Sequence, residues 1–96
     1  MVYTIDEIKF IVVSIAKTYG VSSVSLFGSY AKGTATSDSD IDFIIDKGDL
    51  IGIKYFSLLE DLENAFDCKI DLITRGFSNK EFLNSIKKDE VLLYER

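Results

Sequence analysis

The chain has 96 residues, of which 47% are hydrophobic and 12% are aromatic. This apolar content is enough to bury a core, which excludes a disordered chain, and the length predicts a single domain over residues 1–96. The net charge of −5 argues against direct binding along a nucleic acid, because such binding needs a basic surface. No apolar run approaches the roughly 20 residues of a membrane span, so no membrane association is expected.

The sequence contains no histidine and a single cysteine, Cys68. These counts exclude a zinc site built from the usual ligands and an internal disulfide, and they fit a reducing compartment. The first residues lack the basic flank and cleavage site of a signal peptide, so we expect a cytoplasmic protein. Any bound metal must be a hard ion held by oxygen atoms, with Mg²⁺ expected and Mn²⁺ as the alternative.

The first expected element is a helix between Thr4 and Gly20. Thr4 and Glu7 have the spacing of a capping box, in which each side chain accepts a hydrogen bond from the backbone of the other residue. Apolar residues then recur at helical spacing, and Gly20 stands where a left-handed residue commonly ends a helix. A short strand is expected to follow over residues 21–27.

A polar loop is expected over residues 28–38, beginning with a short helical turn at 29–32. Residues 40–45 are expected to form a second strand, with Ile41, Phe43 and Ile45 on one face and Asp40 and Asp42 on the other. The polar and glycine-containing residues 46–49 then indicate a turn.

A second long helix is expected over residues 50–66, and a third strand over residues 69–74. The helix presents apolar side chains along one stripe, as expected for an element that packs against a sheet. The stripe consists of Ile51, Tyr55, Leu58, Leu59, Leu62 and Phe66.

The last part of the chain begins with a second capping-box pattern, formed by Ser78 and Glu81, which predicts a helix to about Lys88. The apolar residues 91–94 fit either a final helical turn or an edge strand. The element order predicts an α/β (α+β) domain of two or three layers: a small mixed sheet of three to four strands with helices packed on it.

Two aspartates in the second strand are the first candidate functional residues. Asp40 and Asp42 are two positions apart, so their side chains are expected on the same face, opposite to the apolar face. Two neighbouring carboxylates repel each other unless solvent or a cation lies between them, and a divalent ion would remove that repulsion. Ordinary solvent-facing acids on a half-exposed strand are the alternative.

Gly28 and Ser29 follow the first strand and precede a helical turn, a position where free backbone N–H groups can hold a phosphate. The same Ser29 could instead be a simple helix N-cap. The Walker P-loop pattern is absent. If this corner and Asp40 are to contact the same triphosphate, the first two strands must run antiparallel.

Asp71 is the third candidate acid. It lies in the middle of the third strand between apolar residues, where an unpaired carboxylate is unexpected. Beside the second strand it could share a metal ion or accept a proton from an attacking hydroxyl group. An ion pair with Lys69 or Lys54 is the alternative.

The order Gly-Ser, ten residues, then Asp-x-Asp resembles the signature of the DNA polymerase beta-like nucleotidyltransferase superfamily. Residues 28–35 and 39–43 more narrowly resemble the minimal nucleotidyltransferase (MNT) family, which includes the MntA-type antitoxins of HEPN/MNT systems. The resemblance implies the nucleotidyltransferase fold and a set of functional residues. These are Gly28, Ser29 and Lys32 for nucleotide binding, and Asp40, Asp42 and Asp71 for Mg²⁺ binding and catalysis; family members often carry arginine at the position of Lys32.

The resemblance also implies a reaction, in which a nucleoside monophosphate passes from a triphosphate, ATP being expected, to a hydroxyl group. Little chain remains for an acceptor domain, so a partner protein is expected to supply that hydroxyl. In the MNT family the partner is often a helical HEPN-type toxin, which implies an antitoxin that transfers AMP to a partner tyrosine. The alternatives are a non-catalytic antitoxin that neutralises its partner by complex formation, and a transferase acting alone on a small hydroxyl compound.

Overall fold

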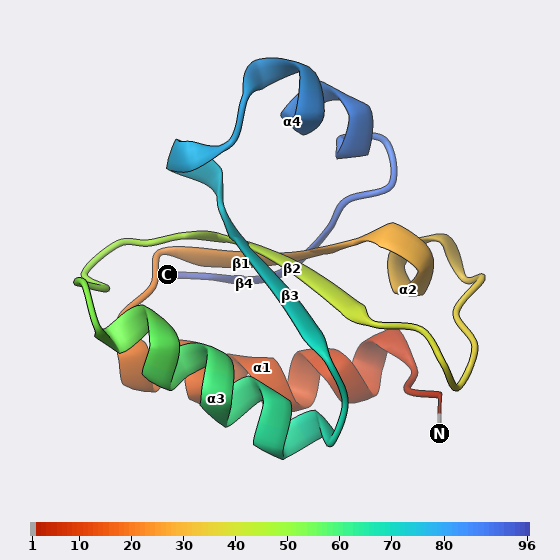
Figure 1. Cartoon of the computed structure of the whole chain (residues 1–96), viewed down its shortest axis with the longest axis horizontal. Helices are drawn as coiled ribbons and strands as arrows, with labels where there is room; N and C mark the ends of the chain where they lie inside the picture. Colours follow the sequence, from red (N-terminus) through yellow and green to blue (C-terminus); the bar gives the residue numbers. More distant parts are fainter. Residues whose placement is uncertain (1) are drawn as a thin grey trace.

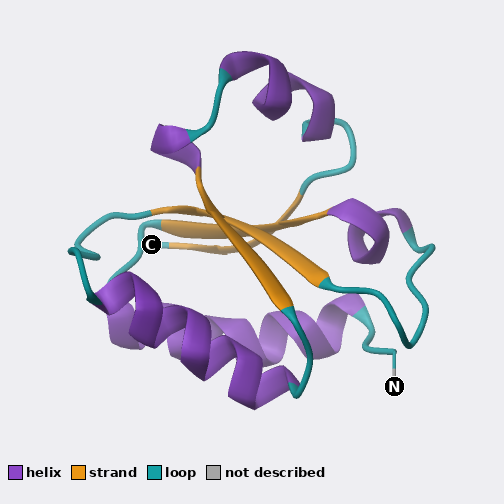
Figure 2. Ribbon diagram, viewed as in Figure 1, coloured by secondary structure: helices purple, strands orange, loops and turns teal. Residues whose placement is uncertain are grey.

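The computed structural model describes residues 2–96, which form a four-stranded sheet with helices on both sides (Figures 1 and 2). Among these residues no helix is long and apolar enough to span a bilayer. The elements in chain order are α1 (Ile5–Tyr19), β1 (Ser23–Phe27), α2 (Gly28–Lys32), β2 (Ile41–Asp46), α3 (Lys54–Phe66), β3 (Ile70–Thr74), the 3₁₀ turn η1 (Arg75–Phe77), α4 (Lys80–Ile86) and β4 (Val91–Glu95).

The strands are arranged in the order β3-β2-β1-β4. Strand β1 pairs antiparallel with β2 and with β4, whereas β2 and β3 run parallel. The predicted mixed sheet and the predicted antiparallel arrangement of the first two strands are therefore confirmed. The C-terminal tail is an edge strand, which decides between the two structures that its sequence allowed.

Helices α1 and α3 cover one face of the sheet, and α4 stands on the opposite side (Figure 1). Helix α1 begins with the predicted capping box, because Thr4 Oγ1 accepts from the Glu7 N–H and Glu7 Oε1 accepts from the Thr4 N–H. Gly20 ends α1 in the left-handed conformation with a φ of 71°. The central core includes Ile8, Val12, Leu26, Ile41, Phe43, Ile45, Leu58, Leu62, Phe66, Ile70 and Leu93.

The start of α3 differs from the prediction. The helix begins at Lys54 instead of residue 50, and Ile51 is 74% exposed instead of lying on the buried stripe. Gly48 and Gly52 adopt left-handed φ values of 53° and 51°, so the chain turns twice before the helix can begin. The apolar residues of this turn have the spacing of a helix in the sequence, although they are not part of one in the structure.

The cap of α4 also differs from the prediction. Asn79, not Ser78, is the N-cap, and its side-chain oxygen accepts from the Phe82 N–H at 2.7 Å. Ser78 Oγ instead donates to the Thr74 carbonyl oxygen at 3.1 Å. Asparagine competes well with serine for this position, so two adjacent capping residues left the register of the helix start open by one residue.

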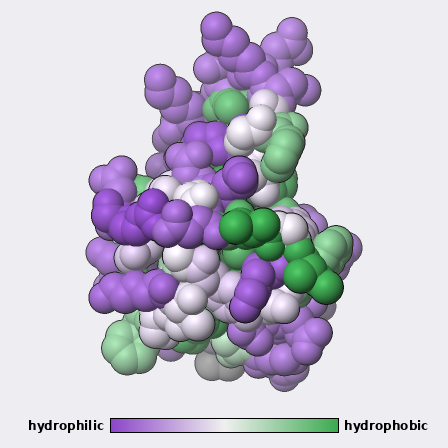
Figure 3. All heavy atoms as spheres, turned by 90° about the vertical axis from the view of Figure 1, so that its left-hand side faces the viewer, coloured by the Kyte–Doolittle hydropathy of each residue, from purple (hydrophilic) through white to green (hydrophobic). Residues whose placement is uncertain are grey.

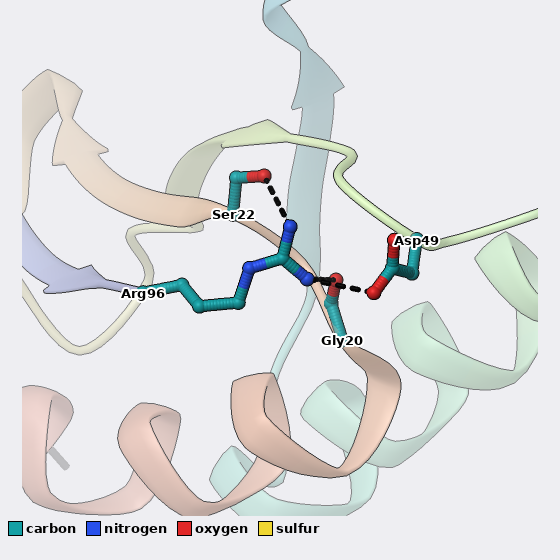
Figure 4. Close-up of polar contacts among 4 residues, drawn as sticks. All are labelled: Gly20, Ser22, Asp49 and Arg96. Atoms are coloured by element: carbon teal, nitrogen blue, oxygen red, sulfur yellow. Dashed lines mark hydrogen bonds and ion pairs between the residues drawn. The ribbon is translucent and has the colours of Figure 1, made fainter.

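The C-terminal residue fastens the end of β4 to the turn that follows α1 (Figure 4). Arg96 Nη1 donates to the Gly20 carbonyl oxygen at 3.1 Å and to Asp49 Oδ2 at 2.7 Å, while Nη2 donates to Ser22 Oγ at 3.4 Å. These contacts lie near the first residue of β1. The candidate site described next lies at the other end of the same strand.

Candidate active site

Three strands place Phe27, Asp42 and Asp71 in one row across the sheet. Asp42 is the register partner of Phe27 on β1 and of Asp71 on β3. Side chains at paired positions point to the same face, which here is the face opposite to α1 and α3, because the adjacent Ile41 and Phe43 belong to the core between sheet and helices. The sheet therefore brings Asp42 and Asp71 side by side, although they are far apart in the sequence.

The backbone of Gly28 forms one wall of this row. Gly28 has a φ of 72°, and a Cβ atom at this position would lie 2.0 Å from Asp42 Oδ2. The Asp42 carboxylate thus occupies the volume that any other residue at position 28 would fill. The glycine-serine corner and the second aspartate of the Asp-x-Asp pair are in direct contact.

Helix α2 starts at this corner without a side-chain cap. Its N-cap residue is Phe27, and no side chain accepts from its first N–H groups. Such uncapped groups, together with a half-buried Ser29, are suited to an anionic ligand. Lys32 is exposed and lies one helical turn further along α2, and its contact with a nucleotide stays a prediction.

The Asp42 carboxyl group is half-buried next to two other acidic side chains. Burial raises the pKa of its carboxyl group from the ordinary value of 3.8 to about 6, with further contributions from a hydrogen bond to Asp71 and from repulsion by Asp71 and Asp40. A group in this state is stabilised either by a proton or by a cation. The carboxylate oxygens of Asp42 and Asp71 are a donor set that suits a hard divalent ion such as Mg²⁺.

Asp40 lies just before β2. Its Oδ2 is 4.0 Å from Lys69 Nζ, so Lys69 pairs with Asp40 and not with Asp71, the partner considered from the sequence. Within residues 2–96 no group of three or more Asp, Glu, Cys or His side chains is gathered as a metal site. The structure thus brings together Asp42, Asp71 and Gly28, while Asp40 lies near enough to repel the Asp42 carboxyl group and is 4.0 Å from Lys69.

Phe27 borders the site, although the sequence predicts it only as the end of a strand. It is 8% exposed, and its ring packs edge-to-face against Phe82 of α4 with the ring centroids 5.8 Å apart. Because Phe27 is paired with Asp42, this apolar contact shields one side of the carboxyl group. The sequence feature that could have indicated this shielding is the large apolar residue directly before Gly28.

Comparison with known proteins is consistent with this geometry. Residues 11–96 match the polymerase beta nucleotidyltransferase family model. A candidate protein adenylyltransferase of Methanocaldococcus jannaschii is 38% identical over 94 residues, which cover 90% of this chain and 94% of that protein.

Two solved structures share the fold. A chain of a toxin–antitoxin complex with AMP-PNP has a TM-score of 0.79 at 23% identity and covers 92% of this chain and 73% of its own. A chain from the complex of tri-AMPylated Shewanella oneidensis HEPN toxin with MNT antitoxin has a TM-score of 0.74 at 19% identity, with coverages of 97% and 74%. The family match over residues 11–96 confirms the resemblance found in the sequence: this chain belongs to the polymerase beta nucleotidyltransferase family.

Proposed function

We propose that this chain is a Mg²⁺-dependent protein adenylyltransferase that transfers AMP from ATP to a hydroxyl group of a partner protein. The observation that carries the proposal is the contact between the Gly28 corner and the Asp42–Asp71 pair, which joins a phosphate-binding element to a cation-binding one. The M. jannaschii relative is named as a candidate for the same activity, and the S. oneidensis complex contains an AMPylated HEPN toxin with its MNT antitoxin. The proposed partner is accordingly a helical HEPN-type protein in the cytoplasm, and the proposed role is that of an antitoxin.

Nucleotide binding is assigned to the start of α2. The backbone N–H groups at Gly28 and Ser29 would hold the triphosphate, with the Ser29 hydroxyl as a further donor and Lys32 as a further positive charge. A relative of the same fold was crystallised with the ATP analogue AMP-PNP, which supports ATP as the donor. Bound Mg²⁺, held by Asp42 and Asp71 with Asp40 as an additional ligand, would offset the negative charge of the triphosphate.

The chemical step is an in-line displacement at the α-phosphorus. The partner's hydroxyl oxygen forms a bond to that phosphorus as the bond to the pyrophosphate oxygen breaks, so AMP stays on the partner and pyrophosphate leaves. The hydroxyl proton passes to a carboxylate, for which Asp71 is suited because it is exposed beside Asp42 on the open face of the sheet. The N–H groups of α2 stabilise the negative charge on the leaving group.

A second candidate function is a non-catalytic antitoxin that neutralises its partner by covering it. The observation that favours it is that Asp40 lies 4.0 Å from Lys69 and that, within residues 2–96, no three carboxylates are gathered as a metal site. Under this alternative, neutralisation of the partner would need neither ATP nor Asp42.

One experiment separates the two functions. The purified chain is incubated with a purified HEPN-type protein from the same organism and with ATP labelled at the α-phosphate, with and without Mg²⁺, and the label on the partner is measured. Asp42→Asn is compared with Asp46→Asn, which makes the same change at an exposed position at the end of the same strand.

Transfer requires label on the partner that depends on Mg²⁺, disappears with Asp42→Asn and persists with Asp46→Asn. The binding alternative requires an unlabelled partner whose toxicity is neutralised equally by the wild-type chain and by Asp42→Asn. Label on small hydroxyl compounds without any partner would refute both and support a stand-alone transferase.

A further inference from the structure

Large apolar side chains are exposed together near the turn that precedes α3. Ile51, Ile53, Phe56 and Phe77 are 74%, 80%, 66% and 85% exposed. Figure 3, which views the molecule from the left-hand side of Figure 1, shows hydrophobic side chains gathered among hydrophilic ones on this face. Several large apolar side chains exposed on one face typically mark a site of protein association.

A cleft bordered by Phe77 has a volume of about 490 Å³, enough for a small ligand or for one or two large side chains. Leu50, Tyr55, Ile73 and Phe77 contribute its apolar lining. The cleft has a fixed wall, because the Tyr55 hydroxyl donates to the Leu72 carbonyl oxygen of β3. An occupant would therefore meet a preformed apolar surface, which keeps the cost of ordering it low.

The charge of the cleft restricts the occupant. Lys47 lines it, no acidic residue does, and Asp46 borders only the smaller hollow beside it. Neither Lys47 nor Lys54 forms an ion pair within residues 2–96. A segment with a bulky apolar side chain next to a carboxylate would match both the lining and the lysine.

A second copy of this chain matches less well. In a two-fold contact the same surface meets its own copy, so two clefts that each carry Lys47 and no acidic lining residue would face each other, and each copy carries a net charge of −5. The charge therefore favours a different protein over a homodimer.

The position of the cleft connects it with the candidate active site. Ile73, which lines the cleft, is two residues from Asp71 on β3, and side chains two apart on a strand share a face at a separation of roughly 6.5–7 Å. A segment held in the cleft would therefore have its neighbouring residues beside Asp71.

We propose that this cleft docks the acceptor protein through an apolar side chain flanked by a carboxylate, and so sets the acceptor hydroxyl beside Asp71. The inference rests on the proposed function for the identity of the partner. It adds a surface and a recognition chemistry that lie outside the nucleotide and metal site.

The test compares two phenylalanines of equal exposure. Phe77 borders the cleft and is 85% exposed, whereas Phe10 lies on the outer side of α1 and is 84% exposed. Binding of the same HEPN-type protein is measured by isothermal titration without ATP for wild type, Phe77→Ser and Phe10→Ser. Lys47→Glu and Lys47→Arg are measured in the same way, and transfer of AMP is measured separately.

We expect Phe77→Ser and Lys47→Glu to raise the Kd about tenfold or more, while Phe10→Ser and Lys47→Arg bind like wild type. All four variants should keep the wild-type affinity for MgATP. The docking proposal would be overturned if Phe77→Ser bound the partner as tightly as wild type, or if Phe10→Ser lost as much affinity as Phe77→Ser. It would also be overturned if the wild-type chain did not bind the partner. A homodimer in sedimentation that Phe77→Ser dissociates would overturn it as well, because it would assign the cleft to a second copy.

The two proposals fail in distinguishable ways. A wild-type chain that binds the partner through the cleft but never labels it would refute AMP transfer and leave the docking surface in place. A wild-type chain that labels the partner, with Phe77→Ser labelling and binding it equally well, would refute the docking surface alone.

Discussion

Replacing Asp42 with asparagine should stabilise the protein while abolishing transfer. The pKa of the folded Asp42 carboxyl is raised from 3.8 to about 6, so the folded state binds this proton more tightly than the unfolded state does. Stability contributed by the protonated form is complete below about pH 4 and is lost as the pH rises through about 6. Asp42→Asn removes the carboxylate, so the variant should have a higher free energy of unfolding than wild type above pH 6, and this difference should disappear near pH 4.

The magnitude follows from the pKa change. A rise from 3.8 to about 6 corresponds to an upper limit of about 3 kcal/mol at 1.36 kcal/mol per pH unit. Because the side chain is only half-buried, solvent screening reduces this to about 1 kcal/mol. For a domain of this size that energy corresponds to a rise in Tm of about 4–8 °C.

Thermal unfolding between pH 4 and 8, with and without Mg²⁺, measures both parts of the prediction. At pH 8, Mg²⁺ should raise the Tm of the wild-type chain, because a cation relieves the same repulsion, and should have little effect on Asp42→Asn. The matched change Asp46→Asn should alter neither quantity. An Asp42→Asn variant that is less stable than wild type at pH 8, or that gains as much from Mg²⁺, would refute the reasoning.

Three further substitutions test the surroundings of the site and the fold. Gly28→Ala should abolish AMP transfer, whereas Gly33→Ala should retain it. Both glycines have a left-handed φ, which strains alanine by about 1 kcal/mol or more, but only at position 28 would the added Cβ meet Asp42. Transfer by Gly28→Ala at the wild-type rate would contradict that contact. Thr4→Ala should lower the free energy of unfolding by about 1 kcal/mol in urea titrations, through loss of the capping box, and no change would show that this cap contributes nothing. Arg75→Met should lower the free energy of unfolding by about 1–2 kcal/mol, because the half-buried Glu90, whose Oε2 lies 2.7 Å from Arg75 Nη2, loses its partner. A double-mutant cycle with Glu90→Gln that gives no coupling energy would contradict this.

The sequence predicted the elements that local chemistry determines. The capping box at Thr4, the left-handed Gly20 and the buried face of β2 each depend on residues close together in the chain, and all three are present. The antiparallel pairing of β1 and β2 followed from requiring the glycine-serine corner and the acidic pair to meet one ligand.

Features that depend on distant residues were beyond the sequence. The register that pairs Asp42 with Asp71 is set by how β3 docks after the intervening helix α3, and no local pattern encodes it. The close packing of Asp42 against the Gly28 backbone is likewise a result of tertiary packing, and so is the pairing of Asp40 with Lys69. At Ile51 the local pattern was misleading, because its helical spacing predicted a buried position and the side chain is exposed.

The central claim is that Asp42 and Asp71 jointly bind a cation that carries the triphosphate to the Gly28 corner. Isothermal titration of ATP into the wild-type chain and into Asp71→Asn, each in Mg²⁺ and in EDTA, tests it most directly. The account predicts binding by the wild-type chain only with Mg²⁺, and an affinity reduced about tenfold or more in Asp71→Asn. ATP binding that is equally tight in EDTA, or unchanged in Asp71→Asn, would contradict it.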